Sequence, residues 1–182
     1  MNLLLRLLWL FIASRSRSAV PPLGPCRTPF RVWPTDLDVL RHVNNGIYLS
    51  IMDLARVDLM MRSGFAAKVK QQGWFPVVVA ETIQFRRSLK LFQRFEIETR
   101  VIGWDDKAVI VEQQFLSGGE AVAHALVRAR FLSKRGGAVT PRELVVLLGL
   151  PPESPAMSIY ATRWNAEQVE WKGGRNEAGR LT

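Results

Sequence analysis

Two carboxylates, a histidine and two side-chain amides fall within one short stretch of the chain. In order they are Asp36, Asp38, His42, Asn44 and Asn45. A carboxylate can attack the carbon of a thioester carbonyl directly, or it can take a proton from a water that attacks instead. Asp and Asn also cap helices and fill turns, so each residue alone is more often structural. Together they supply the groups that acyl transfer requires.

A helix is predicted directly after this stretch, from Asn45 to about Arg62. Its apolar residues have helical spacing and a broad buried face: Ile47, Tyr48, Ile51, Met52, Leu54, Ala55, Leu59 and Met60. Gly64 supplies a stop. The first turn of a helix has unpartnered backbone N–H groups, and with the helix dipole they attract a polarised carbonyl oxygen. A loop carboxylate beside such a turn is a minimal acyl-transfer site, in which the N–H groups stabilise the oxyanion.

Strands are predicted on both sides of this helix. A first strand covers residues 28–33, and four more cover residues 77–85, 95–104, 108–115 and 121–131. In the second of these four, Phe95, Ile97 and Thr99 alternate with charged residues, as in an antiparallel strand with one buried face. A short helix at 141–148 closes the domain, and the tail from Pro151 is predicted to be irregular. A helix buried on nearly all sides needs a sheet to wrap it, which indicates an α+β fold.

The stretch and its helix resemble the hot-dog thioesterases of the 4-hydroxybenzoyl-CoA thioesterase type. That motif is Asp-x-Asp, a short loop, and then Asn-Tyr or Asn-x-x-Tyr entering the central helix. Here it reads Asp36-Leu37-Asp38, followed by His42-Val43-Asn44-Asn45-Gly46-Ile47-Tyr48. More narrowly, Trp-Pro-Thr-Asp-Leu-Asp with Met52-Asp53-Leu54-Ala55-Arg56 is similar to a bacterial branch of uncharacterised thioesterase-like proteins. The resemblance covers residues 27–132 and implies an antiparallel sheet wrapped around a long central helix.

The resemblance also implies roles for single residues. The second acid of the motif is the family's catalytic carboxylate and matches Asp38, and the backbone N–H that polarises the carbonyl matches Asn45. Asp36 would then shape the loop, and an exchange of the two acids' roles is the main local alternative. His42 could orient a water or Asp38, or could make only a structural hydrogen bond. The motif's remaining residues, Asn44, Gly46 and Tyr48, are expected to contact substrate.

Further substrate contacts are expected outside the motif. Asp53 matches a helix position that recognises the acyl group in some relatives, although a surface pair with Arg56 is its structural alternative. Glu81 falls on the same side of its strand as Val77, Val79, Ile83 and Phe85, where a carboxylate needs a partner or a raised pKa. Arg86 and Arg87, with Lys90, Lys107, Arg128 and Arg130, could hold the phosphates of CoA. Asp105-Asp106 occupies a turn where some relatives are basic, so their phosphate contacts do not transfer directly.

The composition limits the remaining function classes. Hydrophobic residues make up 48% of the 182 residues, enough for the core of a single domain. Cys26 is the one cysteine and there are two histidines, too few for a Cys/His zinc cage, so no metal site and no cofactor are expected. The net charge of +9 favours anionic partners. Nucleic acid is the least favoured of these, because no aromatic-basic motif or DNA-reading helix is present.

The first residues form an apolar run interrupted only by Arg6 and followed by Ser14-Arg15-Ser16-Arg17-Ser18. The run is about half the length of a membrane span, and its charges follow rather than precede it, which disfavours a secretory signal. Leucines cover both sides of the corresponding helix. We therefore expect it to be buried against its own domain or a dimer mate, or to make peripheral membrane contact through residues 1–13. The expected location is cytoplasmic, with membrane association as an option.

The predicted organisation has three parts: an apolar segment and linker at 1–26, a hot-dog thioesterase domain at 27–150, and a C-terminal extension at 151–182. The leading hypothesis is an acyl-CoA thioesterase, active as a homodimer or homotetramer because sites in the family it resembles lie between subunits. The alternative from another class is a non-catalytic acyl-CoA-binding or membrane-associated hot-dog module. A hot-dog dehydratase is a further enzymatic rival, but the Asp-x-Asp spacing fits hydrolysis better. The acyl group itself is not specified by the sequence.

Overall fold

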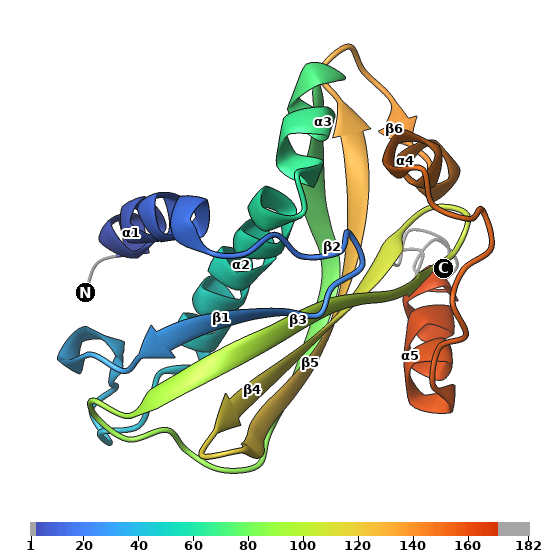
Figure 1. Ribbon diagram of the computed structural model, residues 1–182. Coiled ribbons are helices and arrows are strands. Elements are labelled where there is room, and N and C mark those ends of the chain that lie inside the picture. The colour runs from blue at the N-terminus through green and yellow to red at the C-terminus, as the bar shows by residue number, and fades with distance from the viewer. Residues whose placement is uncertain (1–2, 171–182) are drawn as a thin grey trace, which may run out of the picture.

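A curved antiparallel sheet wraps around one long helix, α2 (Figure 1). The structure is a computed structural model that describes residues 3–170. Its helices are α1 (Leu3–Ser16), α2 (Asn45–Arg62), α3 (Phe65–Gln71), α4 (Pro141–Leu148) and α5 (Ile159–Glu170). Its strands are β1 (Cys26–Arg31), β2 (Trp74–Phe85), β3 (Arg94–Trp104), β4 (Val109–Ser117), β5 (Glu120–Ser133) and β6 (Ala138–Val139). The predicted α+β hot-dog fold is confirmed.

The strands are hydrogen-bonded in the order β1-β3-β4-β5-β2, and the short β6 adds to β5. All neighbouring pairs are antiparallel. The predicted bounds of α2 and α4 agree with the structure, and the four long strands were predicted to within a few residues. The first strand begins two residues earlier than predicted, at Cys26 rather than Thr28. The short helix α3 was not predicted.

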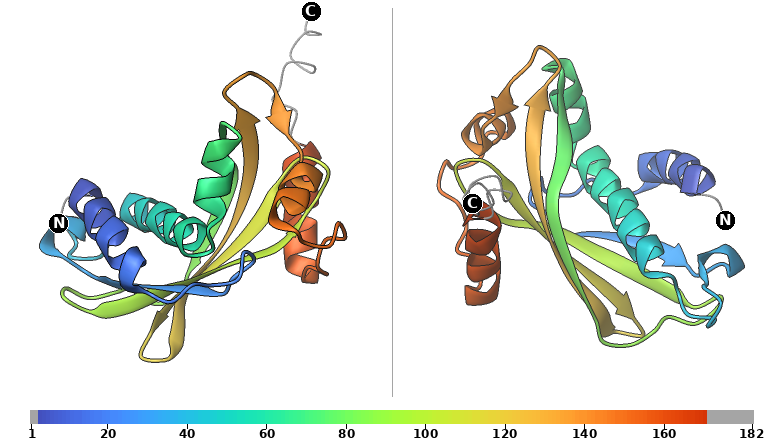
Figure 2. Two further views of the ribbon diagram at one scale, coloured as in Figure 1. Left: turned by 45° about the horizontal axis from the view of Figure 1, so that its top comes forward. Right: turned by 180° about the vertical axis from the view of Figure 1, so that it is seen from behind.

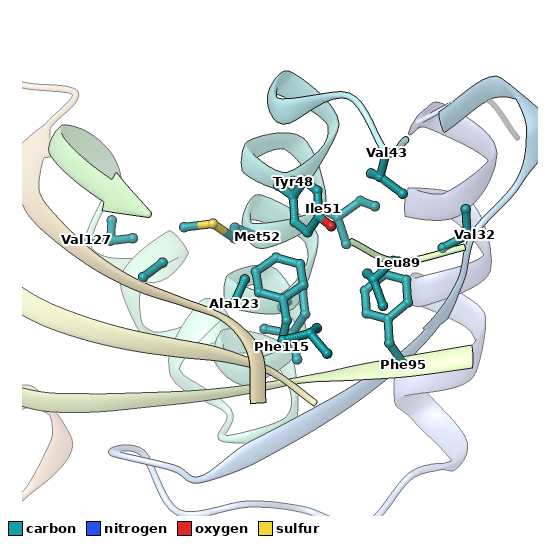
Figure 3. Close-up of a cluster of buried hydrophobic side chains, with 14 of the residues drawn as sticks. Val32, Val43, Tyr48, Ile51, Met52, Leu89, Phe95, Phe115, Ala123 and Val127 are labelled. Atoms are coloured by element: carbon teal, nitrogen blue, oxygen red, sulfur yellow. The ribbon is translucent and has the colours of Figure 1, made fainter. Parts of the chain in front are cut away.

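The main core lies between α2 and the concave face of the sheet. Figure 3 shows Tyr48, Ile51 and Met52 of α2 pointing toward Phe95 and Phe115 of the sheet. The rings of Tyr48 and Phe115 have centroids 5.1 Å apart. Each such side chain, when fully buried, stabilises the fold by roughly 1.5–3 kcal/mol. This packing fixes α2, and with it the loop that enters α2.

A register shift in β2 changes which of its residues face the core. The pairing with β5 shifts between Val78 and Ala80, so Val78 pairs with Ala129 and Glu81 with Val127. A bulge of this kind inserts one extra residue and reverses the alternation beyond it. Glu81 therefore shares the concave side with Val78 and Ile83, and the prediction that it shares a side with Val77 is wrong.

The tail after Pro151 is not irregular throughout, contrary to the prediction. Residues Ile159–Glu170 form α5, which packs on the convex face of the sheet (Figure 2). Its Asn165 accepts a hydrogen bond from Arg128 of β5 and donates one to Asp105 at 2.9 Å. Arg128 and Asp105 are also ion-paired. Polar contacts fasten this helix, so apolar periodicity does not signal it.

The N-terminal helix packs on the domain through a mostly polar side. Its buried residues are Arg6, Leu10 and Ser14, whereas most of its leucines are exposed. Asp58 of α2 is fully buried, with Arg17 and Arg62 each 3.3 Å from its carboxylate. Its other oxygen has no hydrogen-bond partner in the described structure. The Arg6–Asp36 and Arg17–Asp58 pairs therefore join α1 and the residue just after it to segments far along the chain.

Candidate active site

Asp38 lies in a tight loop between a 3-10 turn at Pro34–Asp36 and the start of α2. Its backbone N–H donates to the carbonyl oxygen of His42 at 2.8 Å, and Leu37 and Val43 form an isolated β-bridge. The Asp38 Oδ1 atom accepts hydrogen bonds from the N–H groups of Leu40 (2.9 Å) and His42 (3.1 Å). Within residues 3–170, no group donates to its Oδ2. The carboxylate is thus oriented through one oxygen and open at the other.

The loop contains a strained residue beside this carboxylate. Arg41 has a left-handed backbone with φ of 61°, and its N–H donates to the carbonyl oxygen of Asp38 at 3.0 Å. A non-glycine residue in this region costs about 1–3 kcal/mol, and such residues cluster at functional sites. The strain supports a functional reading of the loop.

Asp36 has a different environment, although it is only two residues from Asp38. Its side chain retains 3% of its accessible surface and lies 2.5 Å from Arg6 of α1. The same carboxylate accepts from the backbone N–H of Trp33 at 2.7 Å, and the carbonyl oxygen of Asp36 accepts from Asn44 at 2.9 Å. Asp36 therefore ties together the two ends of the loop and α1, and a substrate could reach it only by displacing these contacts.

The start of α2 leaves one backbone amide open. Asn44 is the N-cap, and its Oδ1 accepts from Gly46 N–H at 2.8 Å. The N–H groups of Ile47 and Tyr48 donate to the carbonyl oxygen of Asn44. Within the described part of the chain, no group accepts from the N–H of Asn45. At the positive end of a helix dipole, such an amide can stabilise an oxyanion.

The other residues of the motif divide between surface and core. His42 contacts Asp38 through its backbone, and its exposed ring makes no hydrogen bond to any described residue. Gly46 serves the cap, where a Cβ would come within 3.2 Å of Asn44 Oδ1. Tyr48 is buried against Phe85 and Phe115, and burial raises the pKa of its hydroxyl. The structure therefore places Tyr48 in the core and not at an accessible surface.

A polar cluster lies further along α2. Arg56 is ion-paired with Asp53, donates to Gln113 at 2.7 Å and lies 3.9 Å from Glu81. Gln113 is fully buried and also donates to the carbonyl oxygen of Met52. Burial raises the pKa of Glu81 and the nearby Asp53 adds to this, whereas Arg56 opposes it. No sequence pattern signals Gln113, because a glutamine in a strand ordinarily faces solvent.

An apolar cavity of about 430 Å³ opens beside this cluster. Its volume is within the range of roughly 300–1,000 Å³ that small-molecule sites occupy. Asp53 and Arg56 lie at its polar side, and apolar side chains from α2, α3, the sheet and α4 form most of the rest. These include Val57, Met60, Phe65, Val78, Trp104 and Leu148. The lining of this cavity is almost wholly apolar.

The basic residues predicted to hold phosphate do not form one site. Arg87 is exposed and paired with Glu120 at 2.6 Å, and Arg86 is exposed nearby. Arg128 is instead almost fully buried with Asp105 and Asn165 on the convex side. The prediction that Arg128 could hold a phosphate of CoA is therefore wrong, because its guanidinium is already paired.

Two further features concern residues 3–170 only. None of the helices in this range is long and apolar enough to cross a membrane. No three His, Cys, Asp or Glu side chains in it are grouped so that they could hold a metal ion.

The curved sheet around α2, with a loop carboxylate at the helix start, defines a hot-dog domain of the thioesterase type. A sequence model of the thioesterase-like superfamily matches residues 32–157, and the chain belongs to that superfamily. The resemblance seen in the motif residues is thereby confirmed. Protein THEM6 of Xenopus laevis is 42% identical over 99 residues, which cover 54% of this chain and 48% of that protein. The chain spans about half the length of the curated relatives it matches.

Solved structures share the same fold. The YbaW probable thioesterase of Escherichia coli is 28% identical, with a TM-score of 0.63 over 67% of this chain and 95% of that protein. A thioesterase of Thermus thermophilus, solved as a complex with coenzyme A and Zn, is 26% identical, with a TM-score of 0.57 over 71% of this chain and 98% of that one. Strands β2 to β6, α2 and the loop before it lie within the family match, whereas β1 precedes it.

Proposed function

We propose that the protein hydrolyses acyl-CoA thioesters, with Asp38 as the catalytic carboxylate and the N–H of Asn45 as the oxyanion donor. One observation carries this proposal. A carboxylate with one open oxygen and an amide with no acceptor occur in the same hydrogen-bonded loop and helix start. Asp36, the rival acid, is already engaged by Arg6 and Trp33. The division of roles between the two acids is thus supported by their contacts.

The reaction follows from these two groups. As a general base, Asp38 takes one proton from a water whose oxygen bonds to the thioester carbon. The carbonyl electrons move to oxygen, where the Asn45 N–H stabilises them. When the carbonyl re-forms, the C–S bond breaks and Asp38 returns its proton to the CoA thiolate. The products are the free acid and CoA. Asp38 could instead attack the carbon itself, in which case water hydrolyses the resulting anhydride.

The cavity beside Arg56 and Asp53 is proposed as the acyl site. Its lining is almost wholly apolar. Burial of an acyl group there would therefore stabilise the bound substrate by about 25 cal/mol for each Å² of apolar surface removed from water. Coenzyme A as the thiol portion is supported by the complex of the Thermus relative. Asp53 lies eight residues beyond Asn45, about 12 Å along the helix, so the cavity extends away from its own catalytic loop.

A second copy of the chain is proposed to complete the site. Among residues 3–170, β2 is an edge strand that pairs with β5 alone, and it carries exposed Phe75, Val78, Val79 and Phe85. Long apolar edge strands are usually covered, because their free N–H and C=O groups can pair with another chain. Pairing of β2 with its copy would bring the catalytic loop of one subunit toward the cavity of the other. Sedimentation should then show a dimer or a larger even assembly.

The assay compares the wild type, Asp38→Asn and Asp106→Asn on a panel of aliphatic and aromatic acyl-CoA esters. Asp106 is an exposed acid in the turn between β3 and β4 and is outside the catalytic loop, so it is the matched control for loss of one carboxylate. Asp38→Asn should lower kcat about 10²–10⁴-fold, whereas Asp106→Asn should leave it unchanged. Full activity in Asp38→Asn would disprove the assignment. Tight acyl-CoA binding by the wild type without turnover would favour the non-catalytic module.

A further inference from the structure

α1 presents its polar side to the protein and its apolar side outward. Arg6, Leu10 and Ser14 recur at a spacing of four and are buried. The rest of the helix surface carries large apolar residues that retain 41–70% of their accessible surface: Leu4, Leu5, Leu8, Trp9, Phe11 and Ile12. Monomeric soluble proteins rarely expose contiguous apolar patches above a few hundred Å², and larger ones mark interaction sites. We call this set the outer face of α1.

The helix is fastened to the domain along its whole length, so the direction of its outer face is fixed. Near its start Arg6 pairs with Asp36 and donates to the carbonyl oxygen of Arg31. Ser14 contacts Met61 of α2, and just beyond the helix Arg17 pairs with the buried Asp58. Figures 1 and 2 show α1 on the outside of α2, on the side away from α5. Without a partner, the outer face would be exposed to water.

The charges around the outer face indicate an anionic surface as its partner. No acidic residue occurs before Asp36, whereas this part of the chain carries five arginines. Arg6, Arg17 and Arg27 are paired with Asp36, Asp58 and Glu98, so Arg15 is the cation that bears on the outer face. Arg15 is exposed in the last turn, four residues after Phe11 and seven after Leu8, and thus lies on the outer face itself. An arginine at the end of a leucine-rich face can extend to phosphate headgroups while its stem stays in apolar surroundings. A second copy of α1 would bring Arg15 of each subunit to a like-charged surface.

The length and composition of the helix suit a position in the plane of a membrane. The fourteen residues of α1 extend about 21 Å, whereas the hydrocarbon core that a spanning helix crosses is about 30 Å thick. Trp9, which is 62% exposed, is a residue that favours the boundary between headgroups and acyl chains. Exposed Val39 and Leu40 follow Asp38 in the loop that Arg6 contacts through Asp36. The loop therefore adds apolar side chains to the same part of the molecule.

We propose that the outer face of α1 docks the protein on an anionic lipid surface and holds the catalytic loop beside it. This goes beyond thioester hydrolysis, since docking requires neither Asp38 nor a substrate. Because Arg6 joins α1 to Asp36, two residues from Asp38, the loop keeps a fixed distance from the membrane. Amphipathic acyl thioesters collect at such surfaces, so docking would shorten their path to the site.

The test is flotation of the full chain with vesicles of phosphatidylcholine alone, or of phosphatidylcholine with one quarter phosphatidylglycerol. Leu8→Asp/Ile12→Asp removes the apolar character of the outer face. Val146→Asp/Ile159→Asp adds the same charge at two exposed apolar residues of α4 and α5, away from α1, and is the matched control. Circular dichroism and thermal unfolding establish that each variant is folded. Asp38→Asn is included, so that docking is measured separately from turnover.

The wild type, the control and Asp38→Asn should float with the anionic vesicles, and the α1 variant should bind at least tenfold more weakly. Arg15→Gln should weaken binding to the anionic vesicles about fivefold and not change binding to neutral ones. Failure of the wild type to float, or undiminished flotation of the α1 variant, would overturn the proposal. So would a wild type that stays off both vesicles while the α1 variant shifts to a smaller assembly, because the outer face would then be a contact between copies.

Discussion

The guanidinium of Arg6 lies 2.5 Å from the carboxylate of Asp36, thirty residues away, and both side chains are almost fully buried. The pair joins the first turns of α1 to the loop that carries Asp38. An unpaired buried charge costs several kcal/mol, so Arg6 can be buried only because an acidic side chain pairs with it there. No local sequence pattern around Arg6 predicts that its partner is Asp36.

Arg6→Met should therefore lower the free energy of unfolding by about 3–5 kcal/mol, because it leaves the Asp36 carboxylate buried without its partner. Urea unfolding followed by circular dichroism measures the loss. Arg6→Met/Asp36→Asn should recover part of it, and Arg15→Ala, on the exposed side of the same helix, should cost less than about 0.5 kcal/mol. A loss below about 1 kcal/mol for Arg6→Met would show that the pair is not stabilising.

Asn45→Pro should lower kcat about 10²–10³-fold, the effect of removing one oxyanion donor. Proline is tolerated at the first position of a helix, and Asn44 before it already has the extended backbone (ψ 135°) that a following proline requires. Asn45→Ala keeps the N–H and should retain nearly wild-type kcat. Acyl-CoA turnover and thermal unfolding are measured for both. Equal activity of the proline and alanine variants would exclude the amide from catalysis.

Leu148→Trp should reduce kcat/KM for the longest acyl-CoA that the wild type accepts by at least tenfold, with little change for the shortest. Leu148 of α4 lines the cavity, and an indole there takes up space that an acyl chain would need. One methylene in an apolar site is worth about 1–3 kcal/mol. Val146→Trp, on the exposed side of the same helix, is the control. A chain-length profile unchanged by Leu148→Trp would place the acyl group elsewhere.

Asp105 makes stability depend on acid pH. Burial alone would raise the pKa of this carboxyl, but hydrogen bonds from Arg128, Asn165 and two backbone N–H groups outweigh it and hold the pKa at about 2. Because the pKa is lower in the folded state, the ionised carboxylate stabilises the folded protein at pH values above its unfolded-state pKa near 4. This contribution is lost as the pH falls toward 2. Asp105→Asn should be less stable than wild type near pH 7, and the gap should narrow by up to about 2 kcal/mol toward pH 2. Denaturant unfolding near pH 7 and near pH 2 measures the difference in free energy of unfolding between wild type and Asp105→Asn. Asp106→Asn should show no such pH-dependent difference from wild type.

The parts of the fold that the sequence predicted are those set by local periodicity. α2 was predicted with its observed bounds, since Ile51, Met52 and Ala55 recur at helical spacing and all face the core. The side of α1 that packs could not be predicted, because Arg6 is buried only through Asp36. The phase of β2 was lost at its bulge, which places Glu81 and Val78 on one side. In each of the last two cases the deciding contact is distant in sequence.

The candidate site divides in the same way. Asp38 and the helix start were found from residue types in one stretch, which the loop hydrogen bonds then hold together. Arg56 was noted only as a surface partner of Asp53, and the buried Gln113 that fixes it was missed. The cavity needs α3, α4 and the sheet to form, so no single segment of the sequence signals it.

The bond between Asn165 and Arg128 bears on where this domain can be cut. Met157 and Ser154 lie so close over Gly103 that a Cβ there would come within 2.8 Å of each, and Trp104 N–H donates to Ser154. A fragment that ends at Leu150 would keep all six strands but would expose the backbone of Gly103 and Trp104. It would also remove Asn165, the side-chain amide that accepts a hydrogen bond from Arg128. Shortened versions intended for crystallisation or screening should therefore extend through α5, even though the family match ends at residue 157.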